Sequence, residues 1–152
     1  LGNRSLLCSI NKPNAKDVLN SSIKFRESFR PYGCSCLLEH SQEYFDIPKD
    51  FENPFMSFAC DINSNYKEKL KEVSHIDGTS RMQTVRREQN PPFYNLISAF
   101  GAQSGIYCLL NTSLNVMGEP IVETVRDAKD FLDKTNIHGL AIGQYYIMKK
   151  YE

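Results

Sequence analysis

The stretch NPPFYNLISAFGAQSGIYCLLNTSLN, residues 90–115, predicts a helix, a buried strand and a polar turn in succession. Its two prolines suit the first turn of a helix, where a backbone N–H is not needed. Apolar residues from Phe93 to Phe100 then recur at the spacing of one helical face. Gly105 ends this helix, and IYCLLN predicts a buried strand. A helix that leads directly into a buried strand indicates a fold that mixes helices with a sheet.

The rest of the chain continues this alternation. Further helices are expected over residues 13–23 and 124–135, where apolar side chains recur every three to four residues. Apolar or alternating stretches predict four more strands, over residues 29–40, 55–62, 80–87 and 139–150. Residues 41–45 are predicted to form one helical turn, and residues 63–74 a charged, solvated loop. The fold class is therefore α/β or α+β, with one domain over residues 1–152 built around a mixed sheet.

Composition and charge narrow the class of protein. Of the 152 residues, 41% are hydrophobic, which is enough for a core, and 18 basic residues balance 18 acidic ones. This balance gives no net field that would attract nucleic acid or an anionic membrane. No apolar run approaches the ~20 residues that a membrane-spanning helix needs. The N-terminus resembles no signal peptide, so we expect a cytoplasmic protein, and the lack of an initiator Met suggests a piece of a longer one.

The cysteines are scattered, and their number is odd: Cys8, Cys34, Cys36, Cys60 and Cys108. This pattern argues against a disulfide framework. Cys34 and Cys36 share one face of the expected strand, which favours two small buried side chains over a pair of metal ligands. No second Cys/His pair stands at zinc spacing, so no metal site is expected in this domain.

Three polar clusters interrupt the predicted elements. The first, KFRESFRP at residues 24–31, places Lys24, Arg26 and Arg30 around Glu27. Arginine offers a planar fork and lysine a compact charge, so the cluster suits a phosphate or a carboxylate. On an extended strand Lys24 and Arg30 would lie roughly 20 Å apart, so they meet on one anion only if the chain turns or the anion is long. A surface set of ion pairs is the equal alternative.

The second cluster, HIDGTSR, spans residues 75–81. Asp77 and Gly78 are a strong turn signal, because glycine permits positive φ. Backbone N–H groups of such a turn can form a nest for an anion, with Arg81 at its mouth. An ordinary turn is the equal alternative. His75 is a candidate general base, although a lone histidine before a turn is more often structural.

The third cluster is NTSLN, residues 111–115. Small hydroxyls and amides at the carboxyl end of a buried strand suit a phosphate or another polar ligand. Strand alternation should direct Leu114 into the core and Ser113 and Asn115 towards a cavity. The chain has no P-loop, Rossmann or catalytic-triad pattern. The three clusters together indicate anion binding rather than nucleophilic catalysis.

Long, ordered motifs carry a resemblance to a known family: GNRS, KFRESFRP, PFMSF, HIDGTSRMQTV, NPPFYNLI, LLNTSLNVMGEPIV and DAKDFLDKTNIHGLAIGQYYIMKK. They resemble the C-terminal domain of the NodU/CmcH-type carbamoyltransferases over essentially the whole chain. Members of that family join an N-terminal Kae1-like domain to a C-terminal domain similar to YrdC/Sua5. The resemblance implies a YrdC-like twisted mixed β-sheet with flanking helices around a basic cavity, and a Kae1-like domain outside this chain.

The resemblance also implies a reaction. This domain is expected to bind ATP and carbamoyl phosphate, with Mg²⁺, and to form carbamoyl adenylate. The covalently linked Kae1-like domain, which binds iron, would then transfer the carbamoyl group to an acceptor hydroxyl. Such chemistry needs cations and hydrogen-bond donors around phosphate rather than a protein nucleophile. Neither nucleic acid nor a membrane is expected as a partner.

The family motifs imply roles for particular residues. The Lys-x5-Arg pair corresponds to Lys24 and Arg30, and the arginine of H-x-D-G-T-x-R corresponds to Arg81; these three are the expected catalytic residues. The expected binding site for ATP and carbamoyl phosphate comprises Lys24, Arg26, Arg30, His75, Asp77, Gly78, Thr79, Arg81, Asn111, Thr112, Ser113 and Asn115.

The chain departs from the family pattern in a few places. Gly33 and Cys34 replace an Ala-Pro pair, which is expected to loosen the backbone beside Arg30. Leu114 replaces a commoner Phe, and His138 stands where Asp is frequent. Two other functions stay open: a nucleotide-binding module for assembly or regulation without catalysis, and a tRNA-modification protein of the YrdC type. The zero net charge and the lack of an aromatic-basic motif weigh against RNA binding.

Overall fold

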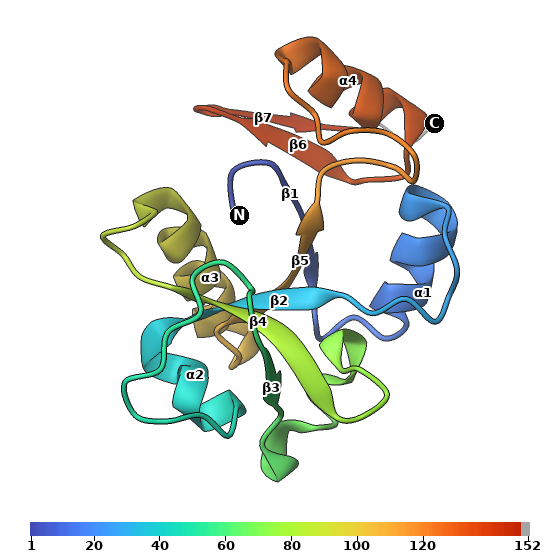
Figure 1. Cartoon of the computed structure of the whole chain (residues 1–152). Helices are drawn as coiled ribbons and strands as arrows, with labels where there is room; N and C mark the ends of the chain where they lie inside the picture. Colours follow the sequence, from blue (N-terminus) through green and yellow to red (C-terminus); the bar gives the residue numbers. More distant parts are fainter. Residues whose placement is uncertain (150–152) are drawn as a thin grey trace. The chain divides into compact units, whose positions relative to one another are not determined.

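A computed structural model of the chain describes residues 1–149 (Figure 1). Its strands are β1 (Ser5–Ser9), β2 (Gly33–Leu37), β3 (Ala59–Asp61), β4 (Thr79–Val85), β5 (Cys108–Ser113), β6 (Gly139–Ile142) and β7 (Tyr145–Met148). Its α-helices are α1 (Ala15–Leu19), α2 (Leu38–Tyr44), α3 (Pro91–Ser104) and α4 (Val125–Lys134). Short turns of other helix types cover η1 (Asn20–Lys24), η2 (Ser64–Tyr66) and η3 (Lys71–Val73).

The chain forms two compact units. The first comprises Leu1–Lys16 and Pro31–Ser113. The second comprises Asp17–Arg30 and the segment that begins at Leu114, described up to residue 149. Each unit is described by itself.

The first unit is built on a five-stranded sheet with the order β1-β5-β2-β4-β3. Strands β2 and β4 run parallel, and the other neighbouring pairs run antiparallel. The prediction of a mixed sheet combined with helices is therefore confirmed. Helix α3 and the sheet share a buried apolar cluster of Leu37, Val85, Phe93, Ile97 and Leu109.

Helix α3 forms because its ends are well specified. The side chain of Asn90 accepts a hydrogen bond of 3.2 Å from the backbone N–H of Phe93 and so caps the first turn. Two prolines occupy the first two helical positions. Gly105 stops the helix in the left-handed region, with φ of 76°, and its N–H donates to the oxygen of Gly101. The expected helix and the buried strand after it are both confirmed.

Three predicted strands differ from the structure. The strand expected over residues 29–40 is limited to β2, because α2 already begins at Leu38. The strand expected over residues 55–62 is only the three-residue β3. The long strand expected over residues 139–150 is a hairpin of β6 and β7, because Gly143 turns the chain with φ of 57°; Lys150 lies outside the described residues.

Other differences are smaller. Strand β1, which pairs with β5 from Ser5 to Ser9, was not expected at all. The charged loop expected over residues 63–74 contains the short helices η2 and η3. The helix expected over residues 13–23 is α1 followed by the wider turn η1, which ends at Lys24.

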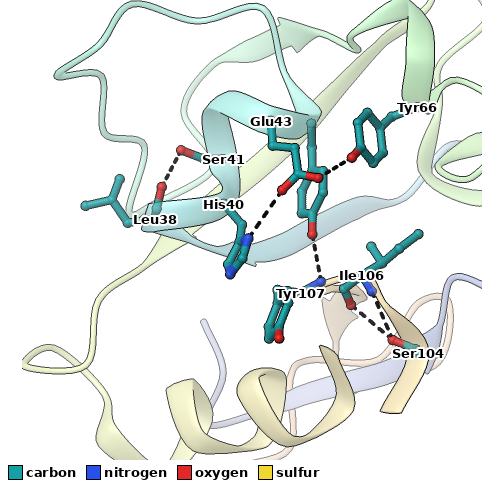
Figure 2. Close-up of polar contacts among 9 residues, drawn as sticks. Leu38, His40, Ser41, Glu43, Tyr66, Ser104, Ile106 and Tyr107 are labelled. Carbon is teal, nitrogen blue, oxygen red and sulfur yellow. Dashed lines mark hydrogen bonds and ion pairs between the residues drawn. The ribbon is translucent and has the colours of Figure 1, made fainter. Parts of the chain in front are cut away.

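Helix α2 is held by contacts that Figure 2 shows. Glu43 Oε2 lies 3.4 Å from His40 Nδ1, and the Glu43 carboxylate accepts a hydrogen bond from the Tyr66 hydroxyl. The imidazole of His40 stacks on the Tyr107 ring, with ring centroids 4.0 Å apart. The backbone N–H of Tyr107 donates to the buried Tyr44 hydroxyl at 3.0 Å. These contacts join the helix to η2 and to the residue that precedes β5.

The second unit places α4 against the β6–β7 hairpin. Buried apolar side chains fill it, among them Leu19, Ile23, Leu114, Phe131, Leu132 and Leu140. Helix α4 begins with a capping box. The Thr124 hydroxyl accepts from the N–H of Asp127 at 3.1 Å, and the Asp127 carboxylate accepts from the N–H of Thr124 at 2.9 Å.

Candidate functional site

One face of β4 carries the expected polar residues of the first unit. Side chains alternate along a strand, so Thr79, Arg81 and Gln83 project from the same face. Gln83 pairs with Ser35 of β2, and Gly33 of β2 pairs with Asn111 of β5. The sheet therefore gathers polar side chains from three neighbouring strands on one surface.

A buried polar network occupies the middle of this face. The Ser35 hydroxyl donates to Gln83 Oε1 at 2.7 Å, and Asn111 Nδ2 donates to Ser35 Oγ at 2.7 Å and to Gln83 Oε1 at 3.5 Å. All three residues are buried. Asn111 Oδ1 is also buried, yet no residue in 1–149 gives it a hydrogen bond. The cost of such an orphan acceptor makes Asn111 a candidate ligand-binding residue.

Ser35 and Gln83 were not predicted as site residues. Each is a polar residue between apolar neighbours in a buried strand, in the stretches CSC and MQT. A buried polar group requires a partner. The sequence therefore indicates that these two residues form hydrogen bonds inside the fold. The partner of each residue comes from another strand, so the network itself depends on strand order.

The remaining residues of the third cluster do not all share this face. Ser113 lies two residues beyond Asn111 on β5, so strand alternation gives both the same face. Thr112 lies between them and pairs with Leu6 of β1, and its side chain therefore belongs to the opposite face. Asn115 belongs to the second unit.

The segment HIDGTSR forms the predicted turn. Gly78 has φ of 85°, and its N–H donates to the His75 oxygen at 3.1 Å. The Asp77 carboxylate accepts from the backbone N–H of Thr79 at 3.0 Å and from the Thr79 hydroxyl at 2.8 Å. These hydrogen bonds lower the pKa of Asp77. The amides of Gly78 and Thr79 therefore already have acceptors within the turn and are not free for an anion.

The hydrogen bonds of this turn assign the protonation of His75. Its Nδ1 lies 3.0 Å from the Thr79 hydroxyl oxygen, whose single hydrogen points to Asp77. Nδ1 must then be the donor, which leaves Nε2 as an unprotonated acceptor. Nε2 is buried and has no hydrogen-bond partner in the part of the chain that is described. Burial lowers the pKa of His75, and Arg81 lowers it further, although Asp77 opposes the shift.

Arg81 lies on the same face of β4 as Thr79 and Gln83, between them along the strand. Its side chain is exposed and makes no hydrogen bond or ion pair with any other residue in 1–149. Its backbone lies close to Gly33, where a Cβ atom would stand 2.6 Å from the Arg81 oxygen and 3.1 Å from Met56 Sδ. The glycine at position 33 therefore allows a close approach of β2 and β4. The expected loosening of the backbone beside Arg30 stays a prediction.

Lys24 lies in the second unit and is almost fully buried, with 3% of its surface exposed. Its ammonium group donates to the main-chain oxygen and to Oδ1 of Asn115, both at 2.9 Å. Burial lowers the pKa of Lys24 to about 8, and Arg26 contributes in the same direction. Asn115 is held in turn by its Nδ2, which donates to the Glu119 oxygen at 2.8 Å.

The segment from Lys24 to Arg30 is not an extended strand. Phe25 follows η1 in the left-handed region with φ of 50°, and the N–H of Arg30 donates to the Glu27 oxygen at 3.2 Å. The chain thus turns between Lys24 and Arg30, as one of the two predicted conditions requires. The exposed Arg30 guanidinium also forms an ion pair of 3.7 Å with Glu27.

An open cavity of about 360 Å³ adjoins this segment within the second unit. Its lining comprises Asn20, Ser21, Phe25, Arg26, Glu27 and Met117. The Arg26 guanidinium is fixed beside it, since Nε donates to Asn20 Oδ1 at 2.8 Å. The second unit therefore places one of the predicted cations at a concave surface.

The described residues offer neither a cluster of metal ligands nor a membrane-spanning helix. Among residues 1–149, no three histidine, cysteine or acidic side chains gather in a way that would hold a metal ion. Every helix in that same range is too short or too polar to cross a bilayer. All five cysteines are free thiols.

Comparison with known proteins identifies the family. The family described as "Carbamoyltransferase C-terminus" matches residues 1–149, and the chain belongs to that family. The nodulation protein NolNO of Sinorhizobium fredii is 40% identical over 151 residues, which cover 99% of this chain and 22% of that protein. The nodulation protein NolO of Bradyrhizobium diazoefficiens is 38% identical over 151 residues, with 99% of this chain and 28% of that protein covered.

An enzyme is also among the relatives. The 3'-hydroxymethylcephem-O-carbamoyltransferase of Amycolatopsis lactamdurans is 36% identical over 149 residues, which cover 98% of this chain and 28% of that protein. The chain thus spans between about a fifth and a third of the length of these relatives. The resemblance to the NodU/CmcH-type carbamoyltransferases that the motifs indicated is confirmed.

Proposed function

We propose that the protein to which this chain belongs is an O-carbamoyltransferase, and that this domain binds ATP and carbamoyl phosphate and forms carbamoyl adenylate. The observation that supports it most is the family match over residues 1–149, with a relative named as a cephem O-carbamoyltransferase. A linked N-terminal Kae1-like domain, which binds iron, would pass the carbamoyl group to an acceptor hydroxyl. The acceptor would be recognised mainly by that domain.

The proposed reaction balances with water as a co-reactant. Carbamoyl phosphate and water give carbamate and phosphate. A carbamate oxygen then attacks the α-phosphorus of ATP, the bond to the bridging oxygen breaks, and pyrophosphate leaves. The protein must mainly position anions and offset the charge that develops on them, with Mg²⁺ assisting when it is bound.

Each unit by itself offers groups that suit this task. The first unit presents the Arg81 side chain, which has no ion-pair partner among the described residues, on the same sheet face as Ser113. The second unit presents Lys24, Arg26 and Arg30 in one short turn of chain. Arginine can hold phosphate oxygens in a bidentate manner, and a buried ammonium responds strongly to a nearby anion.

The test uses the full-length protein and measures exchange of labelled pyrophosphate into ATP. Exchange should depend on carbamoyl phosphate and should fall by about a hundredfold in Arg81→Ala, in line with the loss of one positioned charge in a phosphoryl-transfer site. Ser113→Ala should also reduce it. The matched control is Arg87→Ala, because Arg87 is an exposed arginine of the same unit, with its guanidinium carbon 5.1 Å from the centroid of the Tyr94 ring.

Two outcomes would contradict the proposal. Exchange that Arg81→Ala leaves unchanged would remove this residue from the site. ATP binding by calorimetry without any exchange in the wild type would favour a nucleotide-binding module for assembly or regulation. Salt-sensitive binding of tRNA would instead favour the YrdC type of function.

A further inference from the structure

Asn111 carries a buried side-chain oxygen without a hydrogen-bond donor among residues 1–149, although its nitrogen is paired. Asn111 is 2% exposed, and its Nδ2 donates to Ser35 and Gln83. Its Oδ1 has no donor among residues 1–149. A buried amide oxygen without a donor costs free energy in the unliganded protein. Such a group becomes favourable when a ligand brings a donor to it.

The neighbouring side chains fix the orientation of this amide. The single Ser35 hydrogen goes to Gln83 Oε1, so Ser35 Oγ is left to accept from Asn111. Turning the Asn111 amide over would bring Oδ1 next to Gln83 Oε1, and two acceptors would then face each other. With Gln83 presenting its Oε1 to Ser35, these two residues hold Asn111 with its oxygen available and its nitrogen occupied.

This orientation selects the chemistry of a ligand group. Phosphate oxygens only accept hydrogen bonds at neutral pH in their ionised form, so they do not pair with an amide oxygen. An N–H or O–H donor does. The carbamoyl group ends in an NH₂, whereas the acetyl group of acetyl phosphate ends in a methyl of similar size that has no donor.

Asn111 and Arg81 stand on either side of Gly33 on this sheet face. Gly33 pairs with Asn111 on one side, and its Cα lies against the Arg81 backbone on the other. Arg81, Gly33 and Asn111 thus form one row across three strands, so the outer two backbones are roughly 10 Å apart. The residue between them has no side chain. Met56 lies next to it, with Sδ 3.1 Å from where a Cβ atom would stand, and a flexible thioether can yield that space to a ligand.

We propose that Asn111 Oδ1 accepts a hydrogen bond from the carbamoyl NH₂ group while Arg81 holds the phosphate, and that Ser35 and Gln83 are positioning residues for this contact. The inference rests on the proposed function, because it names which part of the substrate Asn111 recognises. It makes Asn111 the residue that distinguishes carbamoyl phosphate from other acyl phosphates.

The experiment compares two ligands on the full-length protein by calorimetry: carbamoyl phosphate and acetyl phosphate. The wild type should bind carbamoyl phosphate at least tenfold more tightly. Asn111→Leu, which keeps a similar size and removes the acceptor, should weaken carbamoyl phosphate binding about tenfold and leave acetyl phosphate binding within twofold. Ser35→Ala should shift the same ratio in the same direction by about threefold, because it only frees the orientation of Asn111.

A stability control separates recognition from general damage. Thr135→Val removes a buried hydrogen bond of 2.7 Å to the Phe131 oxygen in the second unit, so it should lower stability without changing the ligand ratio. A ratio that stays within twofold of wild type in Asn111→Leu would overturn the inference. If that variant does not fold, an unchanged ratio in Ser35→Ala would overturn it.

The same measurements distinguish this inference from the proposed function. Selective binding of carbamoyl phosphate that depends on Asn111, without pyrophosphate exchange in the wild type, supports the inference and contradicts the proposed catalysis. Exchange activity with an unchanged ligand ratio in both variants supports the catalysis and contradicts the inference. A wild type that binds neither ligand contradicts both.

Discussion

Lys24 Nζ donates hydrogen bonds of 2.9 Å to both the main-chain oxygen and the Oδ1 of Asn115, a residue 91 positions later in the chain. Both acceptors are neutral, so they stabilise the ammonium group without cancelling its charge. Burial and the nearby Arg26 therefore dominate and lower the pKa of Lys24 to about 8 from an ordinary 10.5. A buried cation of this kind is sensitive to any anion that approaches it.

The first prediction concerns the pH dependence of stability. Because the pKa of Lys24 is lower in the folded chain than in the unfolded chain, the unfolded state binds more protons between about pH 8 and 10.5. The free energy of unfolding should therefore gain a contribution that rises with pH across this window and is lost as the pH falls through 8. Urea unfolding of the wild type and Lys24→Met from pH 7 to 10 measures it as the difference between the two curves.

The control for this experiment is Lys129→Met. Lys129 is exposed and pairs with Asp133 at 2.5 Å, and that carboxylate raises the pKa of Lys129 instead of lowering it. The control curve should lack the rise between pH 8 and 10.5 in its difference from wild type. A flat difference for Lys24→Met as well would show that Lys24 titrates normally and is not held in a buried environment.

The second prediction concerns the stability of the chain at low pH. Burial lowers the pKa of His75 below its ordinary 6.5. Below about pH 6.5 the unfolded chain takes up a proton that the folded chain resists, so the wild type should lose stability as the pH falls through this region. His75→Gln should remove that part of the loss. Urea unfolding at pH 5 to 8 checks it, with the exposed His138→Gln as the control.

An NMR measurement on the wild type tests the hydrogen bonds of His75. If Nδ1 donates to Thr79 as the turn requires, nitrogen-15 shifts of the wild type at pH 7.5 should show a neutral ring protonated on Nδ1. Protonation on Nε2 would contradict the assignment. It would also remove the free acceptor that makes His75 a candidate general base.

Local signals explain which elements could be predicted from the sequence. Helix α3 was predictable because its cap, its prolines, its apolar spacing and its closing glycine all lie within one short stretch. The β6–β7 hairpin was not, because Gly143 interrupts a run whose apolar residues otherwise continue through the turn. A single glycine in such a run signals a bulge or a turn equally well.

In the candidate site, the contacts that could not be predicted join residues that lie far apart in the sequence. Arg81 and Ser113 could be named from their motifs, and Asn111 from its place at the end of a buried strand. The orientation of Asn111 could not, because it depends on Ser35, 76 residues earlier, and that contact follows from the strand order β5-β2-β4. Sequence separation of this size carries no periodic or spacing signal, so only the folded sheet brings these side chains together.

The third prediction concerns the contacts of α2 in Figure 2. The Tyr44 hydroxyl is the acceptor for the backbone N–H of Tyr107, and burial raises the pKa of this hydroxyl. Tyr44→Phe leaves a part-buried N–H without its acceptor, which should cost about 1–3 kcal/mol of stability. Urea unfolding of the chain at pH 7 measures this loss.

Tyr66→Phe is the matched control, because it removes one tyrosine hydroxyl from the same group of contacts. That hydroxyl donates to the exposed Glu43 carboxylate, which water can solvate when the tyrosine is gone. The control should therefore lose less than about 1 kcal/mol. Equal losses in the two variants would mean that the Tyr107 N–H finds water or another acceptor, and that Tyr44 stabilises α2 through ring packing alone.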